Sequence, residues 1–415
     1  MGDNVKETTR MITLIGVIIA IVVAIVLLNN ATKVSTSDNS PDNMTVPVVF
    51  TDHSKNSITK NGAMMNETMN DNLTNLMNSS KNMGEHYMWT NPNANQFKPN
   101  LSNDYLIAPD LKGARGWINS EPFTLEQLRG KVVIVDFWTY SCINCIRTLP
   151  YLVELDKKYR DKGLVIIGVH TPEFEFEKDI DNVKMAVEKY GIMYPVMLDS
   201  NRETWNAYQN RYWPHKYIID ANGQIRFDHI GEGGYEETEK QVQQLLAEIG
   251  QTSNETILTN PSSERNPTTP ELYAGYNFAL PRGESLGNTQ NMQPEQTIDY
   301  KLPENIPADK ITLEGQWNSG SDALVAMGNS AIVLKFTAKS VNIVTDSDGI
   351  RMNISLDKKP ISKDAAGTDA LFDEDVAYIV TGAPQLYNVY KRDYGTHILR
   401  LDVDKRFSFN SFTFG

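Results

Sequence analysis

The sequence predicts a chain with three kinds of structure: an N-terminal transmembrane helix, an α/β domain, and an all-β jelly-roll sandwich. Residues 11–28 contain no charged side chain, strand-like and helical patterns alternate between residues 104 and 250, and short alternating stretches recur from residue 269 onwards. The chain has 415 residues, of which 40% are hydrophobic. This is enough apolar material for more than one core.

Charge and cysteine content exclude two classes of protein. The chain has 39 basic and 52 acidic residues and a formal net charge of -13, so on average it repels a polyanion, and we expect no nucleic-acid partner. It has only two cysteines, Cys142 and Cys145. A disulfide between cysteines separated by two residues closes only a very short loop and cannot cross-link a fold of this size. The chain is therefore not a disulfide-stabilised scaffold.

Residues 1–28 are expected to form a cytoplasmic tip and a membrane anchor. A helix over residues 11–28 is about 27 Å long, against roughly 30 Å for the hydrocarbon core of a bilayer. A cleaved signal peptide is the alternative, but its apolar core is usually about 7–15 residues long and ends in small residues. Lys6 and Arg10 precede the apolar stretch. We therefore expect a single-pass protein of the cell membrane, with its N-terminus in the cytoplasm and the rest outside.

Residues 29–103 differ in composition from the rest of the chain. Of these 75 residues, 17 are Asn and 7 are Met, and no helical or strand period is sustained. Such a segment cannot bury enough apolar surface to offset its ordering entropy. It is predicted to be a disordered tether.

The α/β domain is predicted over residues 104–250. Lys131 to Trp138 is a near-continuous apolar run, typical of a strand covered on both faces. The other predicted elements are a helix from Cys142 to about 160, a strand from Leu164 to Val169, a helix over about 177–190, a strand from Pro195 to Leu198, a helix over about 202–208, strands Lys216–Asp220 and Ile225–Ile230 around the hairpin signal Asn222-Gly223, and a helix over 236–249. This alternation indicates a sheet with helices on both faces.

Residues 251–268 are a polar linker containing Pro and Ser, and residues 269–415 form the predicted β-sandwich. Short alternating stretches separated by turn residues recur throughout this second segment, and no helical pattern lasts. This is typical of an antiparallel sandwich or jelly roll.

The chemistry is expected at Cys142 and Cys145, where a buried strand ends and a helix begins. This context distinguishes a redox pair from half of a zinc site. At a helix N-terminus, the Cys142 sulfur faces unsatisfied N–H groups and the positive end of the helix dipole, which favour the thiolate. Cys145, one turn further along, is placed to attack the mixed disulfide that Cys142 forms. The pair therefore predicts disulfide exchange.

The proton of Cys145 needs an acceptor, and Asp136 on the buried strand is the candidate. A carboxyl group in apolar surroundings has a pKa raised toward neutrality, so it can take a proton that it would not accept in water. An aspartate hydrogen-bonded for structural reasons is the alternative.

The segment from Asp136 to Trp138, followed by Cys142, Cys145 and Pro150, resembles the active-site strand and helix of the thioredoxin superfamily. The longer string WTYSCINCIRTLPYL, with GVHTPEF and YPVMLD downstream, is similar to TlpA/ResA-like extracytoplasmic domains, and most of all to the soluble portion of DipZ-type proteins. In that family a carbohydrate-binding-module-like jelly roll follows the thioredoxin-like domain, and the segments from Thr269 to Gly275 and from Phe412 to Gly415 resemble it.

This resemblance implies a thiol-disulfide oxidoreductase that uses a redox-active Cys142–Cys145 disulfide, with no other cofactor and no metal. It implies a reductant of protein disulfides, although the Cys-Ile-Asn-Cys motif alone leaves the direction of electron flow open. DipZ-type proteins begin with a multi-span membrane domain, and this chain has one predicted span. We therefore expect a separate membrane electron donor, such as a CcdA-like protein.

Four further residues are expected near the cysteines. By the resemblance, Pro214 matches the cis-proline of the superfamily, and the main chain of Trp213 would then be free to pair with an extended substrate. Trp138 and Tyr140 are expected to wall the site, with core packing as the alternative for Trp138. His215 is either structural or a group that tunes the thiol.

Three alternatives remain open. A Sco-type copper metallochaperone fits the Met-rich tether, but its cysteines are separated by three residues, not two. A peroxiredoxin fits Thr139 three residues before Cys142, but Val135 replaces its proline. The β-sandwich could also be the working part and bind carbohydrate, with Trp317, Tyr273 and Tyr276 either as a stacking platform or as core residues.

Overall fold

The computed structural model describes residues 89–252, 255–258 and 266–415. The predicted membrane anchor over residues 11–28 and the tether up to residue 88 lie outside these ranges. Within them, no helix is both long enough and apolar enough to span a bilayer.

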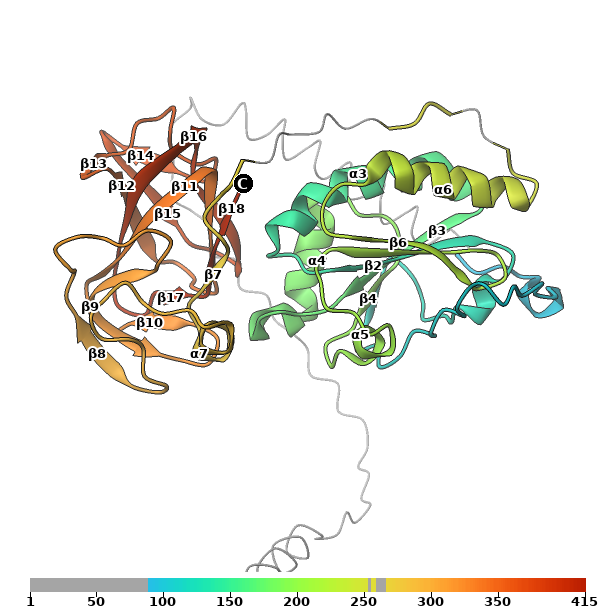
Figure 1. Ribbon diagram of the computed structural model, residues 1–415, viewed down its shortest axis with the longest axis horizontal. Coiled ribbons are helices and arrows are strands. Elements are labelled where there is room, and N and C mark those ends of the chain that lie inside the picture. The colour runs from blue at the N-terminus through green and yellow to red at the C-terminus, as the bar shows by residue number, and fades with distance from the viewer. Residues whose placement is uncertain (1–88, 253–254, 259–265) are drawn as a thin grey trace, which may run out of the picture. The chain divides into compact units, whose positions relative to one another are not determined.

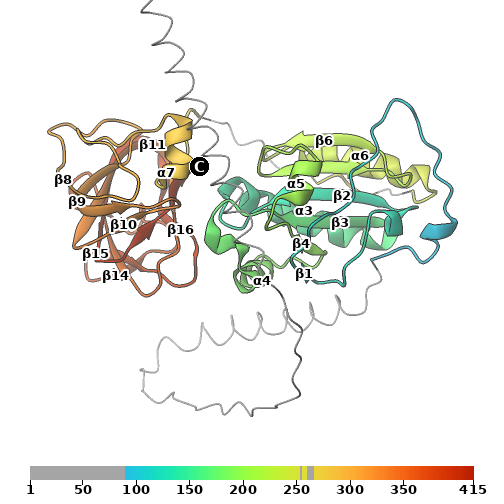
Figure 2. The ribbon, with the colours of Figure 1, turned by 90° about the horizontal axis from the view of Figure 1, so that it is seen from below.

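The first described range forms an α/β domain around one mixed sheet. Its strands lie in the order β1-β4-β3-β2-β5-β6; β2, β3 and β4 are parallel neighbours, and β1, β5 and β6 pair antiparallel (Figure 2). The elements are η1 (Ala94–Gln96), β1 (Trp117–Ile118), η2 (Glu126–Leu128), β2 (Val132–Trp138), α3 (Ile143–Tyr159), η3 (Arg160–Lys162), β3 (Leu164–His170), η4 (Glu175–Lys178), α4 (Ile180–Lys189), β4 (Val196–Leu198), α5 (Glu203–Ala207), β5 (His215–Ile219), β6 (Ile225–Ile230) and α6 (Tyr235–Glu248).

The predicted central strands are confirmed because every residue of β2 and β3 is buried. Helices α3 and α6 lie side by side over one face of the sheet, where the rings of Tyr151 and Tyr235 stack 4.4 Å apart (Figure 1). On the other face, Phe137 of β2 contacts Trp205 and Tyr208. Successive residues of β2 therefore point into two separate layers of the core, and Asp136 points to the side opposite Phe137.

Two boundaries differ from the prediction. The helix expected over about 177–190 is split into η4 and α4, because Asp179 caps α4 by accepting a hydrogen bond from the Asp181 N–H, at 2.9 Å. Trp89, which the sequence places in the tether, is buried in the core of the α/β domain and donates a hydrogen bond to the Asn119 carbonyl.

The hairpin at Asn222-Gly223 is confirmed, with Gly223 at φ +82°.

The described residues from 266 onwards form a β domain. Strands pair antiparallel in the order β14-β15-β12-β16-β11-β9-β10-β17, with β7, β8, β13 and β18 attached. The elements are β7 (Leu272–Tyr273), α7 (Tyr276–Ala279), η5 (Leu280–Arg282), β8 (Thr297–Tyr300), β9 (Thr312–Ser319), β10 (Leu324–Ala326), β11 (Ser330–Thr345), β12 (Arg351–Leu356), β13 (Lys359–Pro360), β14 (Leu371–Asp373), β15 (Val376–Val380), β16 (Gln385–Val403), β17 (Ser408–Phe409) and β18 (Ser411–Phe414). The antiparallel β structure is confirmed, and the jelly-roll arrangement stays a prediction.

Two of the three residues considered for an aromatic platform on the β domain are core residues, and the third, Tyr276, is partly exposed. Trp317 is completely buried and its indole donates to the Glu314 carbonyl, at 3.0 Å. Tyr273 is buried as well. Alternation along β9 turns Trp317 into the core, so its ring cannot stack on a sugar.

Candidate redox site

The two cysteines occupy the turn between β2 and α3, as the sequence predicts. Cys142 is the N-cap of α3, with an extended backbone (φ -77°, ψ 116°), and its Sγ accepts a hydrogen bond from the Cys145 N–H, at 3.3 Å. Both side chains are free thiols. A sulfur at this position occupies the place of the oxygen in an ordinary N-cap, so it meets an otherwise unpaired helix N–H.

The two thiols differ in exposure. Cys142 is partly exposed, whereas Cys145 is 1% exposed and packs in the core. Burial, together with the neighbouring Cys142, raises the pKa of the Cys145 thiol well above its ordinary value. Cys145 therefore stays protonated at neutral pH unless a base takes its proton.

Asp136 lies on the face of the sheet that carries α3, and it is buried. Burial raises the pKa of Asp136 to about 7, and the attraction of Lys216 opposes this rise. One carboxylate oxygen, Oδ1, has no hydrogen-bond partner among the described residues. A buried carboxyl group with a free oxygen and a pKa near neutrality has the properties of a general base.

Lys216 is a functional candidate that sequence reasoning missed. It is 0% exposed and stands directly opposite Asp136 in the β2–β5 ladder, while Gly168 of β3 flanks Asp136 on the other side. Its Nζ lies 3.5 Å from the Gly233 carbonyl and 5.8 Å from the centre of the Tyr235 ring. A lysine is rarely buried without a charged partner, and here the partner across the ladder is the candidate base.

Pro214 immediately precedes β5, and the Trp213–Pro214 peptide bond is cis, as expected. His215, the next residue, pairs with Phe137, so Pro214 lies beside the end of β2 that leads to the cysteines. The Pro214 carbonyl accepts from Gly231 N–H at 2.8 Å, and the Trp213 indole donates to the Thr171 carbonyl at 3.1 Å. Trp213 is partly exposed, which suits the expected contact with substrate.

Trp138 and Tyr140 do not wall the site, so this expectation is corrected. Trp138 is 0% exposed and its ring meets His170 edge-on, with 5.1 Å between ring centres. Tyr140 is 4% exposed and stacks on the same His170 ring. Trp138 belongs to the core because β2 is covered on both faces, and Tyr140 is buried in the turn that follows β2. For Trp138 the alternative of core packing is therefore confirmed.

Each ring nitrogen of His215 has a side-chain oxygen within hydrogen-bond distance. Nδ1 lies 2.6 Å from Asn210 Oδ1, and Nε2 lies 3.0 Å from Asp228 Oδ2. Burial lowers the pKa of His215, although Asp228 opposes this shift. The imidazole therefore has a structural role beside Pro214, and neither ring nitrogen is available to act on a thiol.

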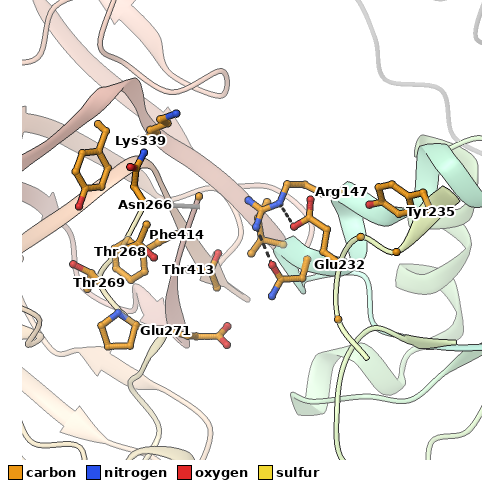
Figure 3. Close-up of a pocket in the computed structure, with 18 of the residues that line it drawn as sticks. Arg147, Glu232, Tyr235, Asn266, Thr268, Thr269, Glu271, Lys339, Thr413 and Phe414 are labelled. Atoms are coloured by element: carbon orange, nitrogen blue, oxygen red, sulfur yellow. Dashed lines mark hydrogen bonds and ion pairs between the residues drawn. The ribbon is translucent and has the colours of Figure 1, made fainter. Parts of the chain in front are cut away.

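The first turn of α3 is tied to the loop after β6. Arg147 Nε donates to Glu232 Oε2 at 2.9 Å, and its Nη2 donates to Asn144 Oδ1 at 2.8 Å (Figure 3). Together with residues 231–235, Ile143, Asn144 and Arg147 form one surface of the α/β domain. This surface begins at the residue that follows Cys142.

Comparisons with known proteins agree with this geometry. Residues 107–228 match the AhpC/TSA family, and residues 269–415 match the thioredoxin like C-terminal domain family. Protein DipZ of Mycobacterium tuberculosis is 41% identical over 271 residues, which are 63% of this chain and 38% of DipZ. This chain thus spans well under half of that relative.

Two smaller relatives are covered over most of their own length. Thiol-disulfide oxidoreductase YkuV of Bacillus subtilis is 36% identical over 141 residues, which are 34% of this chain and 94% of YkuV. Thiol-disulfide oxidoreductase ResA of Bacillus thuringiensis is 30% identical over 144 residues, which are 35% of this chain and 74% of ResA.

Proposed function

Because the chain belongs to the TlpA/ResA/DipZ-like thiol-disulfide oxidoreductases of the thioredoxin superfamily, we propose that it reduces protein disulfides outside the cytoplasm while anchored to the membrane. The observation that carries the proposal is a partly exposed thiol at a helix N-terminus above a buried thiol and a buried carboxyl group. The charge-free stretch at residues 11–28 supports the single-pass anchor.

The reaction has two exchanges. The Cys142 thiolate attacks a substrate disulfide, forming a mixed disulfide and releasing one substrate thiolate. Asp136 then takes the proton of Cys145, and the Cys145 thiolate attacks Cys142 Sγ and releases the second substrate thiolate. The substrate gains two electrons, and the protein ends with a Cys142–Cys145 disulfide. Pro214 and Trp213 guide the substrate chain beside the sulfurs.

The oxidised protein must be reduced again by a separate donor. A CcdA-like membrane protein is the proposed source of these two electrons. The partners are thus protein thiols and disulfides on one side and a membrane reductant on the other.

The reduction potential tests the direction of electron flow. Equilibration of the protein with glutathione buffers should give a value near that of thioredoxin, about -270 mV, and far from about -120 mV for DsbA. DsbA is oxidising because its reduced form is stabilised. A potential near that of DsbA would reverse the proposed direction.

Two further assays separate the remaining alternatives. Tight Cu(I) binding by the reduced pair without reduction of insulin disulfides would favour a Sco-type metallochaperone. Consumption of hydrogen peroxide at a rate above that of insulin reduction would favour a peroxiredoxin. We expect insulin reduction to dominate, since Cys145 is placed to resolve a mixed disulfide.

The β domain has its own candidate function, the binding of carbohydrate, favoured by a groove of about 540 Å³. Its floor is a row of residues paired across neighbouring strands: Glu314 with Ala331, Ala331 with Asp402, and Asp402 with Asn353. Arg400 bridges Glu314 at 2.6 Å and Asp402 at 2.8 Å. The small Ala331 side chain leaves room, and the paired charges leave a face rich in hydrogen-bonding groups, which suits a polyhydroxylated ligand.

Substitution in this groove tests carbohydrate binding. We expect Asn353→Ala to weaken binding of soluble neutral hexasaccharides of glucose or N-acetylglucosamine by about tenfold, because it removes an amide that can bond two hydroxyl groups. Calorimetry on the full chain measures this. Glu304→Ala, at an exposed position away from the groove, is the control. Absence of binding, or equal binding by Asn353→Ala, would reject the assignment.

A further inference from the structure

Glu177 is a buried carboxylate beside the cysteines that the proposed reaction does not use. It belongs to η4 and is completely buried. Its Oε1 accepts hydrogen bonds from the Ser141 hydroxyl at 2.6 Å and from the Ser141 N–H at 3.3 Å. Its Oε2 accepts from the N–H groups of Glu173 at 2.6 Å and Phe174 at 3.0 Å. Each carboxylate oxygen thus accepts hydrogen bonds from a different loop.

The loops that Glu177 joins are the turn before α3 and the segment after β3. Ser141 directly precedes Cys142, and both Ser141 and Glu177 are buried. The same turn is closed by the Cys142 N–H, which lies 3.4 Å from the Thr139 carbonyl, and Thr139 Oγ1 lies 3.4 Å from His170 Nε2. Neutral contacts this long are weak, whereas the Ser141–Glu177 bonds involve a carboxylate, so the carboxylate is the strong anchor of the turn.

The backbone conformation of Cys142 depends on that turn. The hydrogen bond from Cys145 N–H reaches Cys142 Sγ only while Cys142 keeps the extended conformation of an N-cap. A shift at Ser141 would move the Cys142 sulfur away from this N–H and change its exposure. Burial raises the pKa of Glu177, and hydrogen bonds from Ser141, Thr139 and the loop N–H groups lower it.

We propose that Glu177 is a positioning residue for the attacking thiol: through Ser141 it holds the turn 139–142 so that Cys142 Sγ stays at the N-terminus of α3 and open to an incoming disulfide. This assignment rests on the proposed function only in naming Cys142 as the attacking group. The reactivity of Cys142 toward a small alkylating reagent measures its positioning directly, whatever the native substrate.

The test is the rate at which iodoacetamide alkylates Cys142 in the reduced full chain at pH 7, followed by mass spectrometry. Glu177→Gln replaces one acceptor oxygen with an NH₂ group that faces N–H or O–H donors, so we expect alkylation to slow about tenfold. Reduction of insulin should slow by the same factor. Glu175→Gln is the matched control, since Glu175 lies in the same turn but is exposed and pairs with Lys178.

Two more variants separate positioning from stability. Ser141→Ala removes only the hydroxyl bond to Glu177, so it should slow alkylation about threefold, and adding it to Glu177→Gln should slow alkylation no further. Val242→Ala opens the core under α6 but leaves the Ser141–Glu177 hydrogen bonds in place, so it should destabilise the chain without changing alkylation.

The outcomes are distinguishable. Alkylation at the wild-type rate in Glu177→Gln, or an equal loss in Val242→Ala, overturns the proposal. If Glu177→Gln does not fold, Ser141→Ala decides: a slower rate supports the proposal and an unchanged rate overturns it. If wild-type protein fails to reduce insulin while Glu177→Gln still slows alkylation, the proposed function fails and the positioning role stands.

Discussion

Cys145→Ser is expected to turn the protein into a trap for its substrate. Cys142 remains able to attack a disulfide, but a serine hydroxyl cannot release the mixed disulfide, because it is not ionised at neutral pH and does not exchange with sulfur. The covalent complex should therefore accumulate, and turnover with insulin should fall at least about a thousandfold. Non-reducing electrophoresis followed by mass spectrometry would detect the complex and identify the native partner.

Cys142→Ser provides the control for this experiment. It removes the partly exposed thiol, so both turnover and mixed-disulfide formation should be lost, while the buried Cys145 stays unreactive because burial raises its pKa. Retention of turnover by Cys145→Ser would show that a second thiol of the same chain is not needed, and the two-exchange scheme would then be wrong.

Short-range patterns in the sequence predict the elements that carry the cysteines. The apolar run of β2 followed at once by Cys142 and Cys145 predicted a strand, a turn and a helix, and the structure has them at Val132–Trp138 and Ile143–Tyr159. The hairpin at Asn222-Gly223 was predicted for the same reason. Each of these features depends on residues that are close together in the chain.

Lys216 and Glu177 could not be predicted in this way, because their surroundings are made by distant segments. Lys216 follows Pro214 in a short strand, and nothing local shows that β5 pairs with β2 and places it opposite Asp136. Glu177 is one of three glutamates that alternate with phenylalanines in residues 173–177, and nothing local shows that it turns inward to accept a hydrogen bond from Ser141. The functional role of a polar residue depends on strand register and loop packing.

The exposure of the aromatic residues near the cysteines also depends on distant segments of the chain. Trp138 and Tyr140 flank the cysteines in sequence, so they were expected to border the site. In the structure both contact His170 and are buried: Trp138 ends the central strand β2, and Tyr140 lies in the turn after it. Trp213, far away in sequence, is the partly exposed aromatic residue beside the cis-proline. Proximity in the chain was a poor guide to which ring meets solvent.

Asp136→Asn is expected to slow release of the mixed disulfide at neutral pH. Asp136 can take the proton of Cys145 only while ionised, and its pKa is raised to about 7. The release rate of the wild-type protein should therefore rise as pH increases through about 7 and level off above it. Asparagine cannot accept the proton, so release should be about 100-fold slower at pH 7.5. Stopped-flow measurement of release from a preformed mixed disulfide gives this profile, and an unchanged profile would remove Asp136 from the mechanism.

The same substitution should stabilise the reduced protein at high pH. The pKa of Asp136 in the folded protein, about 7, exceeds the ordinary value of about 4. The contribution of Asp136 to the free energy of unfolding is therefore greatest below pH 4 and is lost as pH rises through 7. Between pH 5 and pH 8 this loss is on the order of 3 kcal/mol for a fully buried group. Asparagine does not ionise, so the free energy of unfolding of Asp136→Asn, measured in urea, should rise relative to that of the wild type over this range. The loss of the attraction to Lys216 makes this rise smaller. A variant that loses ground as pH rises would mean that Asp136 is stabilised as a carboxylate by Lys216 and is no general base.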